Sequence, residues 1–413
     1  MTNRVAVTGC GVVCALGNSF AELTSALQAG RSGVRIVSSG HASSDTGARA
    51  RVAACVQVDE ADSNLSATER ALFDPVTRHT MRAAQEALEQ SGAIEDLAVC
   101  QDAGVYLGTG SGGMFAVEDA YRDIWYHGAP PKPLSVISAM ANAPAAHLSI
   151  RFGIKGPNYT YAVACASSAI AIGEAFRAIR AGRLTCAIAG GAEACLTPGV
   201  LRAWQAMRVL ASVDRLAPEA SCRPFSRNRT GIVLGEGAVI FMLEDMEVAR
   251  QRGATVLCEL LGFAANADAS HVCIPSVEGQ AAAMSAALVD AQLAPEEIDY
   301  LNAHGTATRS GDITETRAIR RAFGTHADAL AVSSTKSAHG HLLGASGALE
   351  LAACIAAIRA RFVPATLHLR EADSECDLDF VPNAPRTDVD VRHAMSTSFA
   401  FGGSNAVLVA GLA

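Results

Sequence analysis

The sequence predicts an α/β fold built from two large parts. Short apolar segments of strand length alternate with longer segments of helical periodicity along the whole chain, which is typical of α/β proteins. Half of the 413 residues are hydrophobic and only 18% are charged, so the chain can bury a large core. No low-complexity tract and no long Pro- or Ser-rich linker separates residues 1–252 from residues 253–413. We therefore expect both parts to share one packed body.

In the first part we expect five strands and two helices. We expect the first strand to end in a turn at Gly9 and Gly11, and a later one to be broken by Gly190 and Gly191. An amphipathic helix stops before Gly92, a residue that favours helix C-termini. The expected strands cover 5–8, 104–108, 159–164, 186–189 and 238–243, and the helices cover 73–91 and about 167–181.

The second part shows the same alternation, although the letters contain no strict repeat. A structural repeat of βαβ units is compatible with this pattern but is not visible in the sequence. The expected strands cover 256–261, 300–302, 332–334, 394–399 and 406–410, and the helices cover 279–291 and 347–361.

Charge and hydropathy exclude several functions. The chain has 33 Lys and Arg against 41 Asp and Glu, a formal net charge of −8, and no basic cluster, so we expect no nucleic-acid partner. No run of about 18 apolar residues lacks a charged or polar break, so we expect no membrane span. The apolar start of the chain has no clear cleavage site, which favours a first strand over a signal peptide.

The twelve cysteines are scattered and include no C-x-x-C pair. This pattern is typical of reduced, mostly buried thiols in a cytoplasmic protein. We expect neither a structural zinc site nor another metal site, because paired ligand spacing is absent.

The run Gly9-Cys10-Gly11 is a weak match to a dinucleotide fingerprint. Cys14 stands at its third glycine position, and no acidic residue follows at the expected distance. A tight turn explains the glycines better. The sequence also lacks a P-loop and a G-x-S-x-G elbow, which argues against an NTPase and a serine hydrolase.

Cys165 is a candidate nucleophile. It joins an expected strand to an expected helix, and Ala164 and Ala166 leave its thiol accessible. The positive end of a helix dipole lowers the pKa of a thiol and favours the thiolate. Position alone leaves a second interpretation equally open, in which Cys165 is one more buried cysteine.

Two histidines follow expected strands in the second part. His304 precedes Gly305, and His341 opens a Gly/Ala-rich turn. A single histidine at a strand end is usually structural, but two of them with Cys165 suit thioester chemistry. His339 next to Gly340 and His341 suggests a metal only weakly, because no third ligand is clustered there.

Phe401 precedes two glycines in the loop between the last two expected strands. Its side chain is bulky and its loop can move, and backbone N–H groups in such a turn can bind an oxyanion. An ordinary turn is the alternative.

Four motifs together resemble one family. They occur in its order and spacing, and the likeness extends over nearly the whole chain. The sequence resembles the β-ketoacyl-acyl carrier protein synthases, in the synthase I/II branch of the thiolase superfamily. The motifs are VACASSA around Cys165, NAHGTATRSGD around His304, SSTKSAHGHLLGASGALE around His341 and SFAFGGSN around Phe401.

The resemblance implies a thiolase-like five-layer αβαβα fold of two similar halves. Residues 1–252 would carry Cys165, and residues 253–413 would carry both histidines. It also implies a cytoplasmic homodimer, with the segment ending at Glu193 near the interface.

The family mechanism implies a role for each matching residue. Cys165 would take an acyl chain from acyl carrier protein, with the backbone N–H groups of Cys165 and Phe401 as oxyanion hole. Malonyl-carrier protein would lose CO2, and its carbanion would attack the acyl-cysteine. His304 and His341 would stabilise the enolate charge through Nε2–H. Lys336 and Glu350 would support the histidines.

The resemblance implies no metal and no organic cofactor, because phosphopantetheine arrives on the carrier protein. Thr306 and Thr308 match residues that contact this arm, and Phe401 matches the gate between the acyl and malonyl states.

Some positions depart from the family pattern. Ala400 replaces a glycine of the gate loop, so we expect a stiffer gate. His339 replaces a threonine found in many members, and Cys273 replaces a threonine of the pantetheine tunnel. The usual RPFDxxRDG motif reads RPFSRNRTG at 223–231, without either aspartate. No catalytic group is lost.

Three functions remain open. The first is an elongating ketosynthase of fatty-acid or specialised metabolism, such as type II polyketide or aryl polyene formation. The second is a thiolase-fold acyltransferase acting on CoA esters, against which His341 in GHLLGA argues, because synthase III enzymes have Asn there. The third is the chain-length factor of a heterodimer, which would lack Cys165; an active subunit paired with such a factor stays possible.

Two residues are expected in the acyl pocket. Ser111 stands where synthase II enzymes often carry a bulky aliphatic residue, and Trp204 aligns with an aromatic residue near the far end of the channel. We expect a preference for rigid unsaturated or aryl chains. Packing of Trp204 at a dimer interface, with a neutral Ser111, is an equally open alternative.

Overall fold

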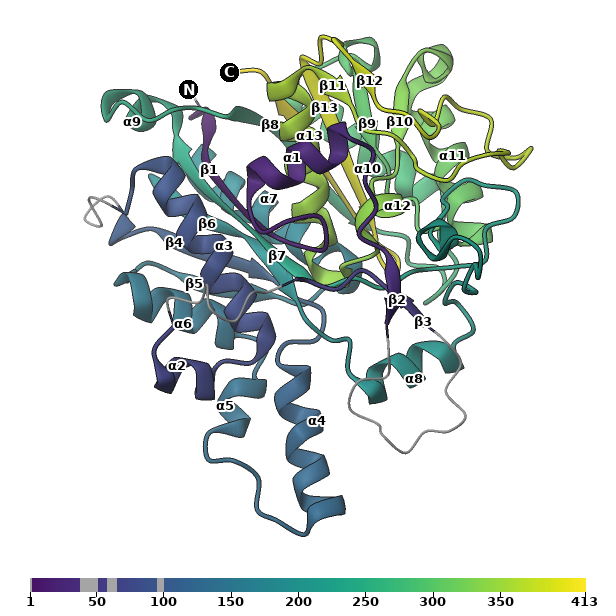
Figure 1. Cartoon of the computed structure of the whole chain (residues 1–413). Coiled ribbons are helices and arrows are strands. Elements are labelled where there is room, and N and C mark those ends of the chain that lie inside the picture. Colours follow the sequence, from purple (N-terminus) through teal and green to yellow (C-terminus); the bar gives the residue numbers. More distant parts are fainter. Residues whose placement is uncertain (1, 38–50, 58–64, 95–99) are drawn as a thin grey trace.

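The computed structural model describes residues 2–37, 51–57, 65–94 and 100–413, and a ten-stranded sheet runs through its centre (Figure 1). The strand order is β10-β9-β13-β14-β8-β1-β7-β6-β4-β5. The first five strands along the chain that join this sheet are β1 (Val5–Val13), β4 (Gly104–Gly108), β5 (Asn158–Tyr161), β6 (Cys186–Glu193) and β7 (Gly237–Asp245). The other five are β8 (Cys258–Ala267), β9 (Tyr300–Asn302), β10 (Ala331–Ser333), β13 (His393–Phe399) and β14 (Ser404–Gly411).

The two sets of five strands have the same topology. Numbered within its own set, each follows the order 1-5-4-2-3. In both sets strands 1, 5 and 4 pair antiparallel, and strands 4, 2 and 3 pair parallel. Among the strands that the structure describes, the two sets are joined by the pairing of β1 with β8 over three residues, Val5 to Val7. The predicted two similar halves are confirmed. They form a structural repeat that is not visible as a repeat in the amino-acid sequence.

Helices complete five layers. The outer face of the first half carries α3 (Pro75–Ser91) and α6 (Ala143–Phe152), and that of the second half carries α10 (Val277–Ala291) and α11 (Arg309–Phe323). Between the two halves lie α7 (Ser167–Arg180) and α13 (Ser346–Ala360), which contact each other. The α13 helix is buried on all sides from Ser346 to Ile358, which agrees with its mainly apolar composition. The order αβαβα agrees with the expected thiolase-like fold.

Alternation along the strands distributes side chains between these layers. On β7, Val239, Phe241 and Leu243 face the central core, whereas Ile240 and Met242 face the outer core under α3. This period of two is the geometry of a strand that is covered on both faces.

Both predicted glycine breaks are wrong. β1 continues through Gly9 and Gly11, and β6 continues through Gly190 and Gly191. A Cβ on Gly11 would lie 1.8 Å from the carbonyl oxygen of Ala83 on α3, and one on Gly190 would lie 2.1 Å from that of Val239. These glycines let backbones approach closely inside the sheet and do not turn the chain.

The other predictions differ mainly at element ends. The strand expected at 159–164 ends at Tyr161, and β8 extends to Ala267, beyond the expected 261. Helix α3 ends before Gly92, as expected, and Gly92 has a left-handed conformation.

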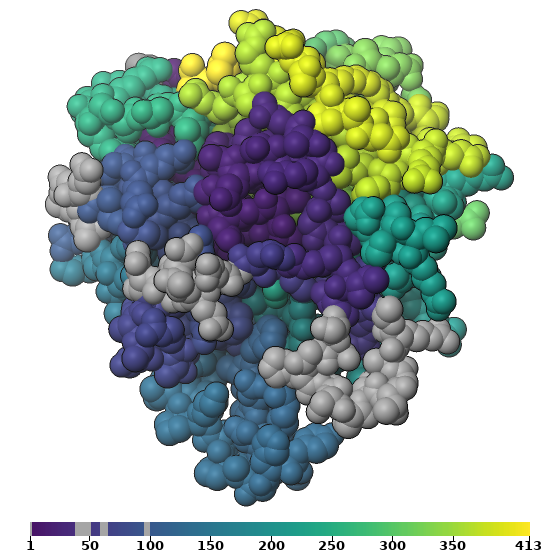
Figure 2. Space-filling model, in the orientation of Figure 1, coloured from purple at the N-terminus to yellow at the C-terminus, as the bar shows by residue number. Residues whose placement is uncertain are grey.

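The remaining elements surround this body. The segment from α4 through a π-helical turn to α5 projects as a tower (Figure 2), and Trp125 and Tyr126 on it are 78% and 86% exposed. These elements are α1 (Phe20–Gln28), β2 (Arg35–Val37), β3 (Arg51–Ala53), α2 (Ala67–Leu72), α4 (Met114–Arg122), α5 (Ser135–Ala139), α8 (Pro198–Ala206), α9 (Met246–Gln251), α12 (Lys336–His339), β11 (Phe362–Val363) and β12 (Arg386–Thr387).

One stretch, Leu343–Ala360, is long and apolar enough to cross a membrane by length and composition alone. However, 89% of it is buried inside the protein, which is the behaviour of a core helix.

Candidate active site

Cys165 lies on a single 3₁₀ turn, Ala164–Ala166, between β5 and the central helix α7. Ala164 has a positive φ of 44°, a conformation that costs a residue with a Cβ roughly 1–2 kcal/mol. Ser167 holds this bend: its Oγ accepts the N–H of Val163 at 2.8 Å and donates to the carbonyl of Ala164 at 2.7 Å. The strained turn presents the thiol at the entry of the central helix.

The second half repeats this turn. Leu343 has a φ of 46° and opens the 3₁₀ turn Leu343–Ala345 before α13. Gly344 therefore occupies the place that Cys165 takes in the first half. His341 lies just before the turn and reaches across to the nucleophile.

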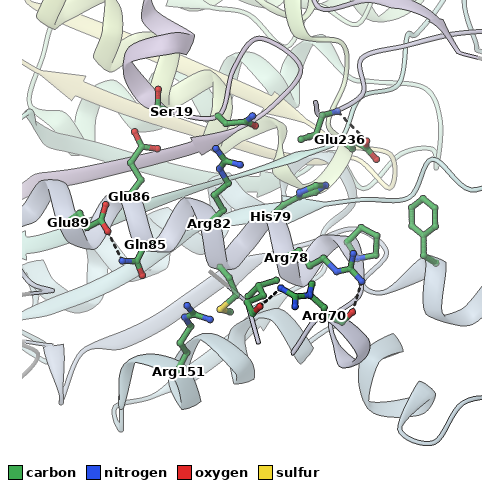
Figure 3. Close-up of a pocket in the computed structure, with 16 residues that line it drawn as sticks. Ser19, Arg70, Arg78, His79, Arg82, Gln85, Glu86, Glu89, Arg151 and Glu236 are labelled. Atoms are coloured by element: carbon green, nitrogen blue, oxygen red, sulfur yellow. Dashed lines mark hydrogen bonds between the residues drawn. The ribbon is translucent and has the colours of Figure 1, made fainter. Parts of the chain in front are cut away.

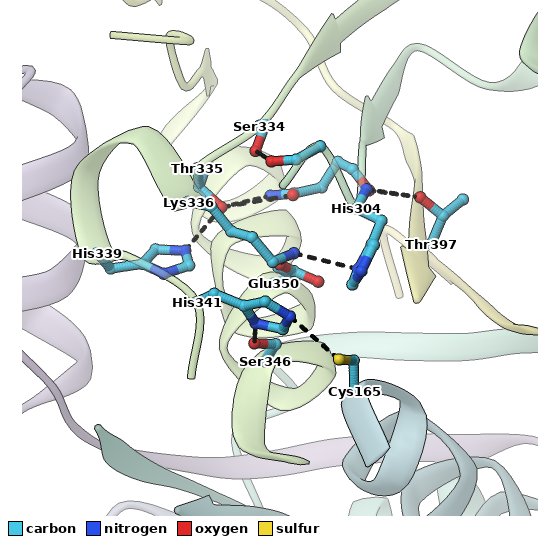
Figure 4. A network of polar contacts seen from close by, with 12 residues as sticks. Cys165, His304, Ser334, Thr335, Lys336, His339, His341, Ser346, Glu350 and Thr397 are labelled. Atoms are coloured by element: carbon cyan, nitrogen blue, oxygen red, sulfur yellow. Dashed lines mark hydrogen bonds and ion pairs between the residues drawn. The ribbon is translucent and has the colours of Figure 1, made fainter. Parts of the chain in front are cut away.

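His341 contacts the thiol directly. Its Nε2 is 3.1 Å from Sγ of Cys165 (Figure 4). Its Nδ1 accepts the backbone N–H of Leu343 at 3.1 Å and lies 2.7 Å from Oγ of Ser346. Because a backbone N–H can only donate, Nδ1 carries no hydrogen, and the hydrogen of the neutral ring is on Nε2.

His304 follows β9 and has the same tautomer. The ammonium of Lys336 lies 3.3 Å from its Nδ1, so this nitrogen is the acceptor and Nε2 carries the hydrogen. Lys336 also forms a buried ion pair with Glu350 of α13. The rings of His304 and His341 meet edge to face, with centroids 5.4 Å apart.

Burial keeps both histidines neutral. It lowers the pKa of His304 and of His341 well below the usual value, and the charge of Lys336 lowers both further. Burial also raises the pKa of Glu350 to about 7, against the opposing charge of Lys336. Two neutral Nε2–H donors therefore face the space above Cys165.

The expectation of a lowered thiol pKa is not met in the resting site. Burial raises the pKa of Cys165 to about 12, because the thiol is taken out of water. The Lys336 charge and a hydrogen bond from the Phe401 backbone act in the opposite direction. The Nε2–H of His341 also points at sulfur and favours the thiolate.

A cavity of about 330 Å³ connects this centre with the surface. Cys165 and both histidines lie on its wall, together with the predicted residues Thr306, Thr308, Cys273 and Phe401. The hydroxyls of Thr306 and Thr308 are 3.0 Å apart. Cys273 is exposed at this wall, next to Ile274, which is 60% exposed.

The loop of Phe401 is anchored to the opposite wall of the cavity. The N–H of Gly402 donates to the carbonyl of Val272 at 2.8 Å, and Gly402 and Gly403 both have positive φ. The ring of Trp204 on α8 lies 6.2 Å from the ring of Phe401. Trp204 thus touches the predicted gate and is half-buried.

Ser111 is exposed in the described chain and does not line this cavity, so its place in an acyl channel stays a prediction. Its backbone N–H donates to Glu193 at 3.1 Å. Glu193 is fully buried and also accepts the N–H groups of Gly110 and Gly344, at 2.7 and 3.0 Å. This carboxylate ties the loop after β4 to the turn before α13.

Glu315 is a site residue that the motifs did not reveal. It accepts the backbone N–H groups of His304 and Gly305, each at 2.7 Å, and the hydroxyl of Thr397 at 2.9 Å. It lies on the buried face of α11, three residues after Asp312, which is also buried. The only sequence signal was this pair of acids three residues apart.

A second cavity, of about 840 Å³, shares no lining residue with the first (Figure 3). Charged side chains of α3 dominate its wall. Glu86 binds the backbone N–H groups of Val12 and Phe20, and Arg78 donates to the carbonyls of Phe73 and Arg70. These groups hold neighbouring segments against α3.

The candidate site unites a thiol with two donors that suit a developing oxyanion, which is the arrangement of a condensing acyltransferase. Residues 2–249 match the family model of the β-ketoacyl synthase N-terminal domain, and residues 257–370 match that of the C-terminal domain. The chain belongs to the β-ketoacyl synthase family.

Individual relatives agree over their whole lengths. The chain is 41% identical to "Nodulation protein E" of Rhizobium meliloti (strain 1021), covering 99% of both chains. It is 40% identical to "3-oxoacyl-[acyl-carrier-protein] synthase 2" of Coxiella burnetii, covering 98% of both. A solved structure, "The ishigamide ketosynthase/chain length factor", superposes with a TM-score of 0.91 at 31% identity, covering 100% of both chains.

Proposed function

We propose that this chain extends an acyl group held on Cys165 by decarboxylative condensation with malonyl-carrier protein. The observation that carries this proposal is the pair of Nε2–H donors on His304 and His341, held neutral and aimed at the space above the thiol. Such donors suit an enolate that develops there.

The first step transfers the acyl group. Sulfur of Cys165 attacks the thioester carbonyl, the bond to the pantetheine sulfur breaks, and the thiol proton passes to that sulfur. The backbone N–H groups of Cys165 and Phe401 bind the oxyanion of the tetrahedral intermediate. The hydrogen bond between the Phe401 backbone and the thiol supports this assignment.

The second step makes the new carbon–carbon bond. The bond to the malonyl carboxylate breaks and CO2 leaves, and its electron pair forms an enolate whose oxygen accepts both Nε2–H donors. The enolate carbon attacks the acyl carbonyl on Cys165, and the cysteine sulfur leaves. Lys336 supports this step by holding the Nδ1 of His304 as an acceptor, and Glu350 balances the Lys336 charge.

We propose acyl carrier protein as the partner that delivers both substrates, with its phosphopantetheine arm passing Thr306 and Thr308. The ligand atoms of Cys165, His304 and His341 lie within 4.8 Å of one another, which resembles a metal site. The Lys336 ammonium is adjacent, and its charge opposes a cation there. Both Nδ1 atoms accept hydrogen bonds, so the ring hydrogens are on the Nε2 atoms that a cation would need. The proposal therefore includes no metal and no organic cofactor.

We propose a dimer in the cytoplasm, where the twelve free thiols stay reduced. A homodimer is the first candidate. A heterodimer with a chain-length factor is the second, and the likeness to the ishigamide ketosynthase/chain length factor favours it. The pathway is fatty-acid synthesis or a specialised type II polyketide or aryl polyene route.

Mass spectrometry after incubation with acyl-carrier protein tests the proposal. We expect the acyl group on Cys165, no transfer in Cys165→Ala, and normal transfer in Cys186→Ala, which removes a buried thiol of β6. Adding malonyl-carrier protein should release CO2 and give the extended product. An adduct on another cysteine, or undiminished condensation by Cys165→Ala, would refute the assignment.

The same assay separates the two kinds of dimer. Condensation by the purified chain alone supports the homodimer. Condensation that requires an added ketosynthase-like subunit without the nucleophile supports the heterodimer.

A further inference from the structure

A chain of hydrogen bonds runs behind the catalytic groups and passes through His339. This side chain is fully buried at the end of the short helix α12. Its Nδ1 lies 2.8 Å from the carbonyl oxygen of Gly340. Because a carbonyl only accepts, Nδ1 carries the hydrogen and Nε2 is free to accept.

The other ring nitrogen meets Thr335. Its Oγ1 lies 3.0 Å from Nε2 of His339 and 3.4 Å from Oδ1 of Asn302, and the hydroxyl donates its one hydrogen to the nearer acceptor, Nε2. The same oxygen accepts from Nδ2 of Asn302, at 3.1 Å. The relay therefore runs from Asn302 through Thr335 and His339 to the Gly340 carbonyl, with each donor matched by an acceptor. Figure 4 shows its central contact, between Thr335 and His339.

Three members of this relay lie within two residues of a catalytic or supporting group in the sequence. Asn302 ends β9 two residues before His304, and Thr335 directly precedes Lys336. The Gly340 carbonyl belongs to the peptide group that leads into His341.

That peptide group is held on both sides. Its carbonyl accepts from His339, and its N–H, on His341, donates to the carbonyl of Val233 at 2.7 Å. Gly340 has a φ of 68°, a conformation that glycine adopts without strain. Rotation of this peptide would turn the imidazole of His341 away from Cys165.

We propose that His339 is a positioning residue that joins His304, Lys336 and His341 into one rigid unit for the decarboxylation step. This inference rests on the proposed function. A threonine at this position would have one hydroxyl in place of two ring nitrogens, so it could not bridge Thr335 and Gly340 in the same way.

The ring is held in its neutral form. Burial and, to a smaller extent, the charge of Lys336 together lower the pKa of His339 to about 3. Nε2 therefore stays an acceptor at the working pH, and the direction of the relay does not change.

The test compares the two half-reactions in His339→Ala. We expect malonyl-carrier protein decarboxylation to fall about 10–100-fold, the usual effect of removing a group that orients a functional histidine. Acyl transfer to Cys165 should fall by a smaller factor, because Cys165 keeps its place on the turn before α7 and loses only the Nε2–H of His341. His339→Asn, whose amide replaces Nδ1 and keeps the Gly340 contact, should retain more decarboxylation than alanine.

Two further variants isolate the relay. Thr335→Val removes the hydroxyl at nearly constant volume and should reproduce part of the decarboxylation defect. Ser337→Ala is the matched control: its hydroxyl is buried on the same helix but bonds the Ser334 carbonyl and the Leu367 N–H, outside the relay. It should leave the ratio of the two half-reactions unchanged.

Wild-type decarboxylation by a folded His339→Ala enzyme would overturn the proposal. So would equal loss of both half-reactions with the same loss in Ser337→Ala, because that indicates a purely structural role. If His339→Ala does not fold, Thr335→Val and His339→Asn provide the test. Wild-type decarboxylation by both of these variants would overturn the proposal.

A measurement that does not depend on enzyme activity tests this inference separately from the proposed function. Nitrogen-15 NMR of histidine should show His341 as the Nε2–H tautomer in the wild type and as a mixture in His339→Ala, because the displaced ring no longer accepts the Leu343 N–H at Nδ1. An unchanged tautomer in His339→Ala overturns the positioning role. Absence of decarboxylation by the wild type, by contrast, refutes the proposed function.

Discussion

The backbone N–H of Leu343 points at Nδ1 of His341, at 3.1 Å. The positive φ of Leu343 belongs to the turn that enters α13, and the equivalent turn in the first half, at Ala164, presents Cys165. The same turn thus presents the nucleophile Cys165 before α7 in the first half. In the second half, before α13, it fixes the tautomer of His341, which donates a hydrogen bond to Cys165. The donor hydrogen on Nε2 follows from the fold itself.

Removing either histidine should affect the two half-reactions unequally. In His304→Ala or His341→Ala, we expect malonyl decarboxylation to fall about 10²–10³-fold, the usual loss for one oxyanion donor. Acylation of Cys165 should fall much less, because the charge that these rings stabilise develops on the malonyl side. Stopped-flow or quench measurements of each half-reaction check this. Equal losses would indicate that the rings activate the thiol or hold the fold.

The half-reactions should also differ in pH dependence. The pKa values of His304 and His341 lie well below the usual value, so neither ring should gain a proton between pH 8 and pH 6, and any change in decarboxylation over this range should follow Glu350, whose pKa is raised to about 7. The pKa of the Cys165 thiol is raised to about 12, so the thiolate fraction, and with it acylation, should increase as pH rises. Rates measured separately over this range check both. A decarboxylation rate that still falls toward pH 6 in Glu350→Gln would show that a ring gains a proton there.

Substitutions in the buried pair of Lys336 and Glu350 should affect the free energy of unfolding and the decarboxylation rate differently. Lys336→Met leaves the Glu350 carboxylate without its partner, which should lower the free energy of unfolding by about 3–5 kcal/mol. Adding Glu350→Leu should restore much of that stability, because no buried charge remains. Decarboxylation should stay impaired in both variants, since His304 has lost its Nδ1 partner. Denaturant unfolding and CO2 release measure the two effects; recovery of activity in the double variant would contradict the role of Lys336.

The sequence predicted the strands, the central helices and the residues that meet at the candidate site, because hydrophobic periodicity and four motifs are local signals. It did not predict how Gly11 and Gly190 are used. The sequence does not distinguish a glycine that lets another backbone approach from a glycine that turns the chain. Only the structure shows the nearby carbonyl oxygen, that of Ala83 for Gly11 and that of Val239 for Gly190. The structural repeat was hidden for a related reason, since topology repeats here while side chains do not.

The supporting groups of the site also needed the three-dimensional structure. Glu315 binds the backbone N–H of His304, and its burial on α11 cannot be distinguished in the sequence from exposure. The thiol pKa of Cys165 was predicted from a helix terminus alone, whereas burial is the larger effect in the resting site. Both cases depend on which groups surround a side chain from distant segments.

The acyl preference is the last prediction, and it concerns Trp204 and Ser111. The ring of Trp204 lies 6.2 Å from that of Phe401, so a flat acyl group that passes the gate would meet an aromatic face. Such a contact adds about 0.5–1.5 kcal/mol, which corresponds to a preference of about 2–13-fold for aryl or polyene chains over saturated chains of equal length. Competition between the two acyl-carrier proteins should show this preference in the wild type and its loss in Trp204→Leu. Ser111→Ile should reduce it as well if Ser111 borders the channel, although this side chain is exposed in the described chain. A wild type that favours saturated chains, or a preference that neither substitution changes, would assign Trp204 to packing alone.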